Sequence, residues 1–135
     1  MSGMPNWHRS RQTIFLCLIL AQGAHSIEEC VTKLYDVFPP ARWVGSLVSH
    51  DPAFGFAVGN AILVAAGLLC WAFPVRLGWR TARGIAWFWT IVELGNGISH
   101  TTMSLLRGGY FPGVATAPLL LLFAGCLAVI EVREV

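Results

Sequence analysis

The chain has 135 residues, of which 56% are hydrophobic and only 12% are charged, and its formal net charge at pH 7 is +2. Soluble domains usually carry about 25% charged residues, and a chain of this length could not bury so much apolar surface in water. The small net charge, without a run of basic residues, excludes nucleic acid as an attractive partner. The composition therefore predicts an integral membrane protein surrounded by the lipid bilayer.

Four apolar segments have the length of a membrane-spanning helix, roughly 17–25 residues. We expect these helices at about residues 12–36, 54–73, 83–106 and 114–131. Pro39 and Pro74 follow the first two segments, where proline removes an amide donor and disfavours helix in the preceding residue. The segments predict an all-α fold, a four-helix transmembrane bundle that forms a single integral membrane domain over residues 1–135.

The first segment also has features of a secretory signal peptide. Arg9 and Arg11 precede the apolar run 14–20, and the small residues AQGA follow at 21–24. Cleavage there would leave the next residues at a new N-terminus. Apolar residues continue as far as Phe38 and three further spans follow, which favours a retained helix.

The distribution of Lys and Arg predicts the orientation in the membrane, because these residues favour cytoplasmic loops. One side carries six of them, and they are Arg9, Arg11, Arg76, Arg80, Arg83 and Arg133. The other side carries three, and they are Lys33, Arg42 and Arg107. We expect a protein of a bacterial-type inner membrane with both termini in the cytoplasm.

The first segment carries three ionisable residues into the membrane, where each charge is costly and marks a functional site by default. His25, Glu28 and Glu29 stand at positions i, i+3 and i+4. Residues three and four apart lie on the same face of a helix, so these side chains are expected to form one polar stripe.

The third segment carries a second polar stripe. Asn96 and His100 are four residues apart, and at 1.5 Å per residue Glu93 lies about 10 Å below His100. His25 and His100 each precede an outer Phe-Pro pair, by 13 and 11 residues respectively. We therefore expect the two stripes to share one layer, with a carboxylate of the first stripe within about 6 Å of His100. The similar spacing also suggests two parallel two-helix repeats related by an axis along the membrane normal.

Two imidazoles with two or three carboxylates are a ligand set for Fe, Zn or Mn. Four-helix carboxylate proteins build metal centres from glutamate and histidine on facing helices. The same groups without metal would form a proton relay, because a carboxyl group withdrawn from water keeps its proton at neutral pH and can act as an acid. A structural reading, in which these polar residues only satisfy one another, is the simplest alternative.

Three short motifs occur in order along the chain. They are HSIEE at 25–29, NGISH at 96–100 and YFPG at 110–113. They resemble the HXXEE, NXXXH and YXPG elements of the HXXEE family of small integral membrane proteins, and the resemblance covers roughly residues 12–131. It implies a metal-dependent or acid–base membrane enzyme and does not supply a substrate.

Our leading hypothesis is a membrane-embedded metal-dependent enzyme, oxidative or hydrolytic, whose substrate is a small apolar or lipid-like molecule that enters from the bilayer. The expected metal ligands are His25, Glu28, Glu29 and His100. The expected catalytic residues are Glu29, Asn96, which would orient a ligand or substrate, and Glu93, which would move protons.

The alternatives are a metal-free isomerase or cyclase that uses the same Glu and His residues as acid and base, and a membrane protein that handles ions or metals. An accessory subunit of a larger complex and a homo-oligomer are both compatible with the sequence.

Overall fold

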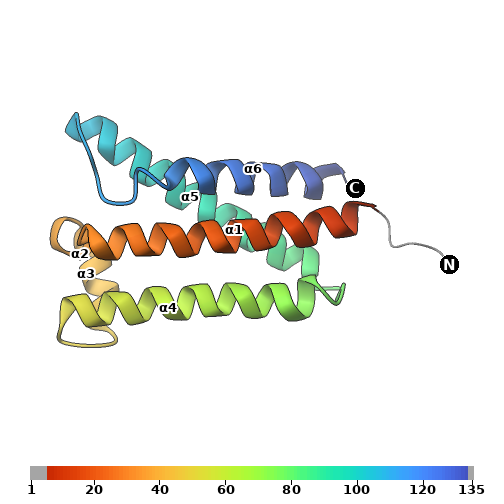
Figure 1. The fold of residues 1–135 in the computed structure, drawn as a ribbon, viewed down its shortest axis with the longest axis horizontal. Coiled ribbons are helices and arrows are strands. Elements are labelled where there is room, and N and C mark those ends of the chain that lie inside the picture. The colour runs from red at the N-terminus through yellow and green to blue at the C-terminus, as the bar shows by residue number, and fades with distance from the viewer. Residues whose placement is uncertain (1–5, 134–135) are drawn as a thin grey trace.

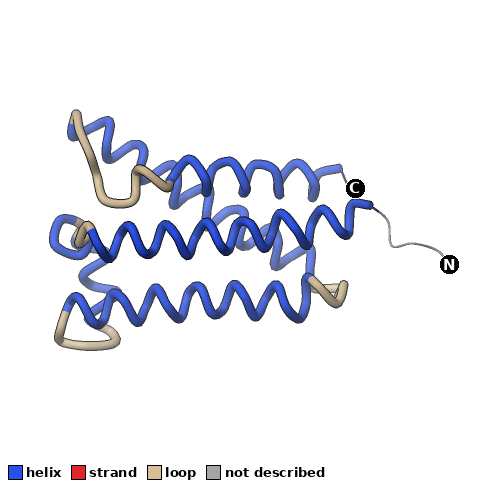
Figure 2. The backbone as a smooth tube through the Cα atoms, viewed as in Figure 1, coloured by secondary structure: helices blue, strands red, loops and turns tan. Residues whose placement is uncertain are grey.

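The computed structural model of the protein describes residues 6–133, and every regular element within that range is helical. Four long helices make up most of it: α1 (Asn6–Val31), α4 (Pro52–Cys70), α5 (Ala82–Arg107) and α6 (Ala117–Arg133). Two short helices, α2 (Leu34–Val37) and α3 (Pro39–Ser46), connect α1 to α4, and a π-helical turn, η1 (Trp71–Val75), extends α4 (Figures 1 and 2). The all-α prediction is confirmed for the described residues.

The helix boundaries differ from those expected at several places, and α6, for example, begins at Ala117 instead of residue 114. The first long helix begins earlier than expected, at Asn6, and ends at Val31 instead of continuing to residue 36. Lys33 adopts a left-handed backbone conformation, with φ 55°, and separates α1 from α2. The segment expected to be a loop after Phe38 contains α3, because Pro39 has the fixed φ that suits the first position of a helix. The proline pair that ends one helix therefore starts another.

The two ends of the molecule carry different features. The start of α1, the end of α6 and the connection between α4 and α5 lie together at what we call the terminal end (Figure 1). Helices α2 and α3 and the loop 108–116 lie at the opposite end, which we call the motif end. The segment 74–83 therefore lies at the same end as the two ends of the described chain.

Two apolar clusters pack the helices along the length of α1. Phe15 of α1 contacts Trp89 of α5 edge-on, with ring centroids 6.5 Å apart, in a cluster nearer the terminal end. The second cluster, at the motif end, includes Tyr35 and Phe111. The polar stripe of α1, residues 22–29, lies between the two clusters along the helix. Burial of apolar side chains on both sides thus positions a polar layer that is itself buried.

Helices α4 and α5 are adjacent only near the terminal end, where η1 contacts α5. From there α5 runs obliquely away from α4 and packs along α6 (Figure 1). At the motif end, α3 occupies part of the space beside α4. The two helices touch through glycine backbones, since a Cβ on Gly55 would lie 2.2 Å from the carbonyl oxygen of Gly45.

Two of the described helices, Asn6–Val31 and Pro52–Val75, are long and apolar enough to cross a bilayer. Helix α6 has 17 residues, and α5 carries charged residues at both ends and Glu93 in its middle. Two such helices point toward membrane association, and the four-span bundle stays a prediction.

A buried ion pair ties α1 to α6 near the terminal end. Arg11 Nε lies 2.6 Å from Glu131 Oε1, and Arg11 Nη2 lies 2.9 Å from Glu131 Oε2. Both residues are buried. The planar guanidinium matches the carboxylate with two parallel hydrogen bonds, which is the strongest geometry for such a pair. The sequence alone indicates Arg11 as a cytoplasmic charge or as part of a signal peptide, and it does not indicate this ion pair.

Replacement of Glu131 by glutamine should destabilise the protein, because it leaves the buried Arg11 guanidinium facing a neutral amide. Loss of one partner of a buried pair costs about 3–5 kcal/mol, and we expect Glu131→Gln to lower the thermal midpoint in detergent accordingly. Arg133→Gln, which removes an exposed charge two residues away, should shift the midpoint little. Equal midpoints for the two variants would contradict a stabilising role for the ion pair.

Candidate functional site

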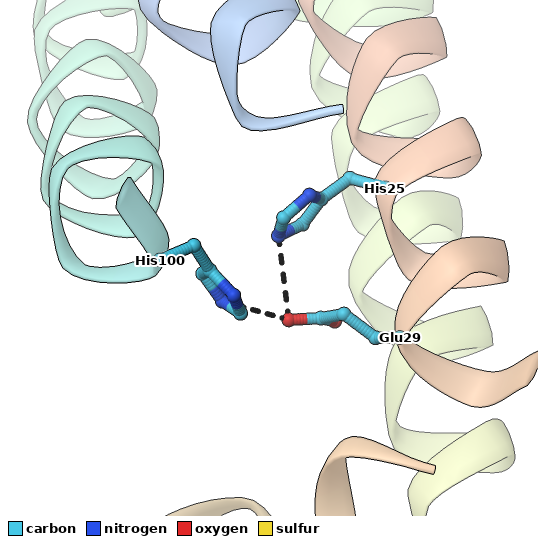
Figure 3. A group of neighbouring side chains, drawn as sticks. All are labelled: His25, Glu29 and His100. Carbon is cyan, nitrogen blue, oxygen red and sulfur yellow. Dashed lines mark ion pairs between the residues drawn. The ribbon is translucent and has the colours of Figure 1, made fainter. Parts of the chain in front are cut away.

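The two polar stripes meet at one carboxylate oxygen (Figure 3). Glu29 Oε1 lies 3.3 Å from His25 Nε2 and 3.0 Å from His100 Nε2. All three side chains are buried, and one ligand atom from each lies within 4.8 Å of the others. The expected approach of a first-stripe carboxylate to His100 is confirmed. We call these three residues the His–Glu–His cluster.

Local helix geometry explains how two helices are enough to build the cluster. His25 and Glu29 are four residues apart on α1, so their side chains leave the same face one turn apart. His100 comes from the half of α5 at the motif end and closes the group from the opposite side (Figure 3). The two imidazole rings meet edge-on, with centroids 4.6 Å apart and planes at 89°.

The hydrogen bond made by His100 Nδ1 determines which ring nitrogen carries the hydrogen. Nδ1 lies 2.6 Å from the carbonyl oxygen of Pro112. A carbonyl oxygen only accepts, so Nδ1 carries the hydrogen and donates it. In a neutral imidazole, Nε2 of His100 then offers a lone pair toward Glu29.

Glu28 is hydrogen-bonded to the loop that precedes α6. Its two carboxylate oxygens accept from the Tyr110 hydroxyl at 2.5 Å, the Ala115 amide at 3.0 Å, the Thr116 amide at 2.8 Å and the Thr116 hydroxyl at 2.5 Å. Partial burial and the bond to Glu28 raise the pKa of the Tyr110 phenol, which keeps it a donor at neutral pH. Four donors around two oxygens is the environment of an ionised carboxylate.

Thr116 carries the influence of Glu28 to the first histidine. The hydroxyl has one hydrogen, and it is donated to Glu28. The same oxygen lies 2.7 Å from His25 Nδ1 and therefore accepts a hydrogen from the ring. His25 Nε2 is then the lone-pair nitrogen, as in His100. It is buried and makes no hydrogen bond with any described residue, since its 3.3 Å contact with Glu29 lacks hydrogen-bond geometry.

Three acceptor atoms therefore converge in a buried space. Two imidazole lone pairs and a carboxylate oxygen facing one another are unfavourable unless a proton or a cation lies between them. The ligand atoms of a tetrahedral zinc site lie about 3.3 Å apart, given bond lengths of roughly 2.0–2.1 Å. The two distances from Glu29 Oε1 to the histidine nitrogens, 3.0 and 3.3 Å, are close to this value, and all three ligand atoms lie within 4.8 Å of one another. The donor set thus suits a divalent metal.

Glu28 was also expected to be a metal ligand, but its carboxylate is not part of the His–Glu–His cluster. Successive helical residues point about 100° apart, and this turn directs Glu28 to the loop while Glu29 faces His100. The carboxylate oxygens of Glu28 are already occupied by the loop donors. Glu28 touches the cluster only indirectly, through Thr116.

Glu93 and Asn96 lie beside the cluster on α5. Glu93 is fully buried, and its carboxylate is 2.6 Å from the side-chain nitrogen of Gln22 when that amide is oriented with its nitrogen toward the carboxylate. Asn96 Nδ2 lies 3.5 Å from Glu93 Oε2. The structure therefore places Asn96 and Glu93 next to each other, with Gln22 as a partner on α1. Gln22 stands three residues before His25, and this spacing predicts that it extends the same polar stripe.

Gly113 allows the loop to pack directly on both imidazoles. A Cβ at this position would lie 2.5 Å from His100 Nδ1 and 2.8 Å from His25 Cε1, and the backbone has φ +92°. Both facts require glycine. Sequence reasoning treated this loop only as a turn and missed Thr116 and the Pro112 carbonyl, because their roles depend on contacts far along the chain.

The cluster also faces open space. Glu29, His100 and Asn96 line a cavity of about 380 Å³ between α4 and α5. A metal bound by three protein ligands would therefore keep a position accessible from this cavity, as in catalytic rather than structural sites.

The residues of the three sequence motifs meet at this one place: HSIEE supplies His25 and Glu29, NGISH supplies His100, and YFPG supplies the loop that holds both imidazoles. The molecule is thus a helical protein built around a buried His–Glu–His cluster. The family model described as "Protein of unknown function with HXXEE motif" matches residues 14–128, and the chain belongs to this family. Comparisons with curated proteins and with solved structures found no match.

Gly113→Ala should disrupt the loop, because its methyl group would displace His100 from the Pro112 carbonyl and because alanine is strained at positive φ. We expect a loss of at least about 1 kcal/mol of stability, measured as a lower thermal midpoint in detergent. Gly109→Ala is the matched control in the same loop, since a Cβ there meets nothing within 4 Å. If both variants melt like the wild type, the close packing of Gly113 on the imidazoles is not important for stability.

Proposed function

We propose that the protein is an integral membrane protein of four spans with both termini in the cytoplasm, and that His25, Glu29 and His100 hold a divalent metal (Fe, Zn or Mn). In this proposal it is an enzyme that acts, oxidatively or hydrolytically, on a small apolar or lipid-like molecule. One observation carries the proposal. Three buried acceptor atoms converge, and the outer nitrogens of both imidazoles are held by partners that direct the lone pairs inward.

The ligand set is typical of catalytic metals. Two histidines and one carboxylate bind zinc in hydrolytic enzymes and iron in oxygenases, with the remaining positions open to water or substrate. Such histidines usually donate a hydrogen bond from their other ring N–H to a carbonyl or carboxylate, which fixes the orientation of the ring. His100 donates directly to the Pro112 carbonyl. His25 donates to the Thr116 hydroxyl, which in turn donates to Glu28.

Each polar neighbour has a role in this proposal. A metal at this site would act as a Lewis acid or a redox centre. Glu29 holds it, Asn96 orients a bound molecule from the cavity wall, and Glu93 holds or moves a proton beside them. The Gln22 amide keeps the Glu93 carboxyl in place.

The distribution of side chains supports a location in the bilayer. Polar groups are buried inside the molecule, while large apolar side chains are exposed on all four long helices. The exposed side chains include Ile27 and Val31 on α1, Ile62 and Leu69 on α4, Ile91 and Ile98 on α5, and Leu122 and Val132 on α6. Exposed apolar surface of this extent is costly in water and favourable in lipid. Helix α6, with 17 residues and about 25 Å of length, is near the lower limit for a span.

A metal-free acid–base enzyme, an isomerase or a cyclase, is the second candidate. It is favoured by the 3.0 Å distance between His100 Nε2 and Glu29 Oε1, which is that of a hydrogen bond. A proton at this position would resolve the conflict between the acceptor atoms as a metal would. The two candidates use the same residues, and metal analysis separates them.

The metal content of the purified protein is the decisive measurement. We expect near-stoichiometric Fe, Zn or Mn by mass spectrometry, and loss of the metal in His25→Ala, Glu29→Ala and His100→Ala. Thr116→Val, which keeps shape but removes the partner of His25, should weaken affinity about 10–100-fold. Binding should also weaken as the pH falls below about 6, because the ligands must be neutral imidazole and ionised carboxylate.

Glu93→Gln is the control for these variants, since it changes a buried carboxyl beside the cluster without removing a ligand. It should retain the metal and lose turnover. A wild-type protein without metal, or equal metal content in Glu29→Ala, would contradict the metal centre. Activity that survives chelation but is lost in Glu29→Gln would instead establish the acid–base enzyme.

The topology can be tested by cysteine labelling in a background without the four native cysteines. A cysteine at Trp79, which is exposed at the terminal end, should react with a membrane-impermeant maleimide only from the cytoplasmic side. Leu47→Cys, exposed beside α3 at the motif end, should react only from the opposite side. Labelling of both positions from the same side would exclude the proposed arrangement.

A further inference from the structure

The cavity beside the His–Glu–His cluster lies between α4 and α5, which diverge toward the motif end, and residues of α2 and α3 complete its lining. Its volume is about 380 Å³. Pockets that hold drug-sized molecules have volumes of roughly 300–1,000 Å³, so this cavity fits one small molecule or a single chain rather than a lipid with two chains.

The lining of the cavity differs between the helices that supply it. Helices α1 and α5 contribute polar side chains, among them Glu29, His100 and Asn96. The lining from α4 and from the segment that includes α3 is mainly apolar and includes Phe38, Val44, Phe56 and Leu63, with Asn60 as its polar residue. An elongated molecule would therefore place a polar head at the cluster and an apolar body toward α3.

The charges of the cavity restrict that head group. Lys and Arg are absent from the described residues that line it, and Glu29 contributes a negative charge. Apart from the proposed metal, a phosphate or phosphodiester would find no cationic group there and would face the negative charge of Glu29, whereas phosphate sites in proteins usually provide Arg, Lys or a helix N-terminus as well. Asn60 is already hydrogen-bonded to the Ser26 hydroxyl and the Phe56 carbonyl, so Asn96 is the neutral amide that suits a hydroxyl or carbonyl oxygen.

The cavity reaches the surface of the molecule beside α4 and α5. Ser99 on α5 lines it and is exposed, and the preceding residue, Ile98, is one of the exposed apolar side chains that the proposed bilayer would cover. Gly59 lines it from α4, where the missing side chain leaves space. A molecule dissolved in the lipid could thus enter between α4 and α5 without crossing water.

From these observations we infer that the cavity binds an uncharged, single-chain alcohol or carbonyl compound from the bilayer. Its oxygen lies at the His–Glu–His cluster and its apolar body lies between α3 and α4. The inference rests on the proposed function for the chemistry at its polar end, and it adds the class of molecule that this site takes.

Photolabelling of the full-length protein, purified with its metal, tests the inference. The probe is decan-1-ol with a diazirine in the middle of its chain, and the comparison probe is the phosphate ester of the same alcohol. We expect the alcohol to label residues within 38–63, as located by peptide mass spectrometry, and unlabelled decan-1-ol to compete. The phosphate ester should label this segment at least about tenfold less.

Two variants that fill the cavity provide the matched comparison. Gly59→Leu and Ser99→Leu should each reduce labelling by at least about tenfold. Gly95→Leu on α5 is the control, because Gly95 does not line the cavity and this variant should leave labelling unchanged. Gly59 and Gly95 are matched sites, since a Cβ at each of them meets nothing within 4 Å. The thermal midpoint of each variant verifies that it is folded.

Metal content measured on the same samples separates this inference from the proposed function. Two results in a protein that contains metal would overturn the inference and leave the metal centre intact. One is that Gly59→Leu and Ser99→Leu do not reduce labelling by the alcohol. The other is that the alcohol and its phosphate ester label the protein equally. Labelling that follows the expected pattern in a protein without metal would support the cavity assignment and contradict the metal centre.

Discussion

The hydrogen bonds between Glu28 and the loop before α6 determine the rest of the site. They hold residues 110–116 against α1, and that loop provides the partners of both imidazoles. Without them, neither ring would have a fixed lone-pair direction, and Glu29 would face two nitrogens of undefined state. The adjacent carboxylates of the HSIEE motif thus have separate tasks. Glu28 fixes the loop, and Glu29 faces the histidines.

Much of the site was predictable because helical spacing is a local property. His25 and Glu29, four residues apart, had to share a face of one helix, and the same holds for Asn96 and His100. Their similar distances from the outer Phe-Pro pairs indicated a common depth. These two facts predicted that a carboxylate of the first stripe would approach His100, and Glu29 does so.

The remaining contacts were not predictable because they depend on tertiary structure. Spacing could not decide which of Glu28 and Glu29 faces the cluster, since both lie near the stripe of His25. Thr116 lies 91 residues from His25, and Arg11 lies 120 residues from its partner Glu131. Similarly, the sequence could not show that Pro39 starts a short helix after ending the preceding one. These features arise from the way the helices pack, and their residues look like ordinary loop or terminal positions.

The glycine contact between α3 and α4 has a consequence for how the cavity could vary. Because Gly45 and Gly55 meet backbone to backbone, the contact between α3 and α4 at this point leaves no room for a side chain. Pro40 and Val44, on the same short helix, line the cavity and do not take part in that contact. The residue of α3 that contacts α4 and the residues of α3 that line the cavity are therefore different. The cavity could be made larger or smaller through Val44 while the scaffold that carries the histidines stays where it is.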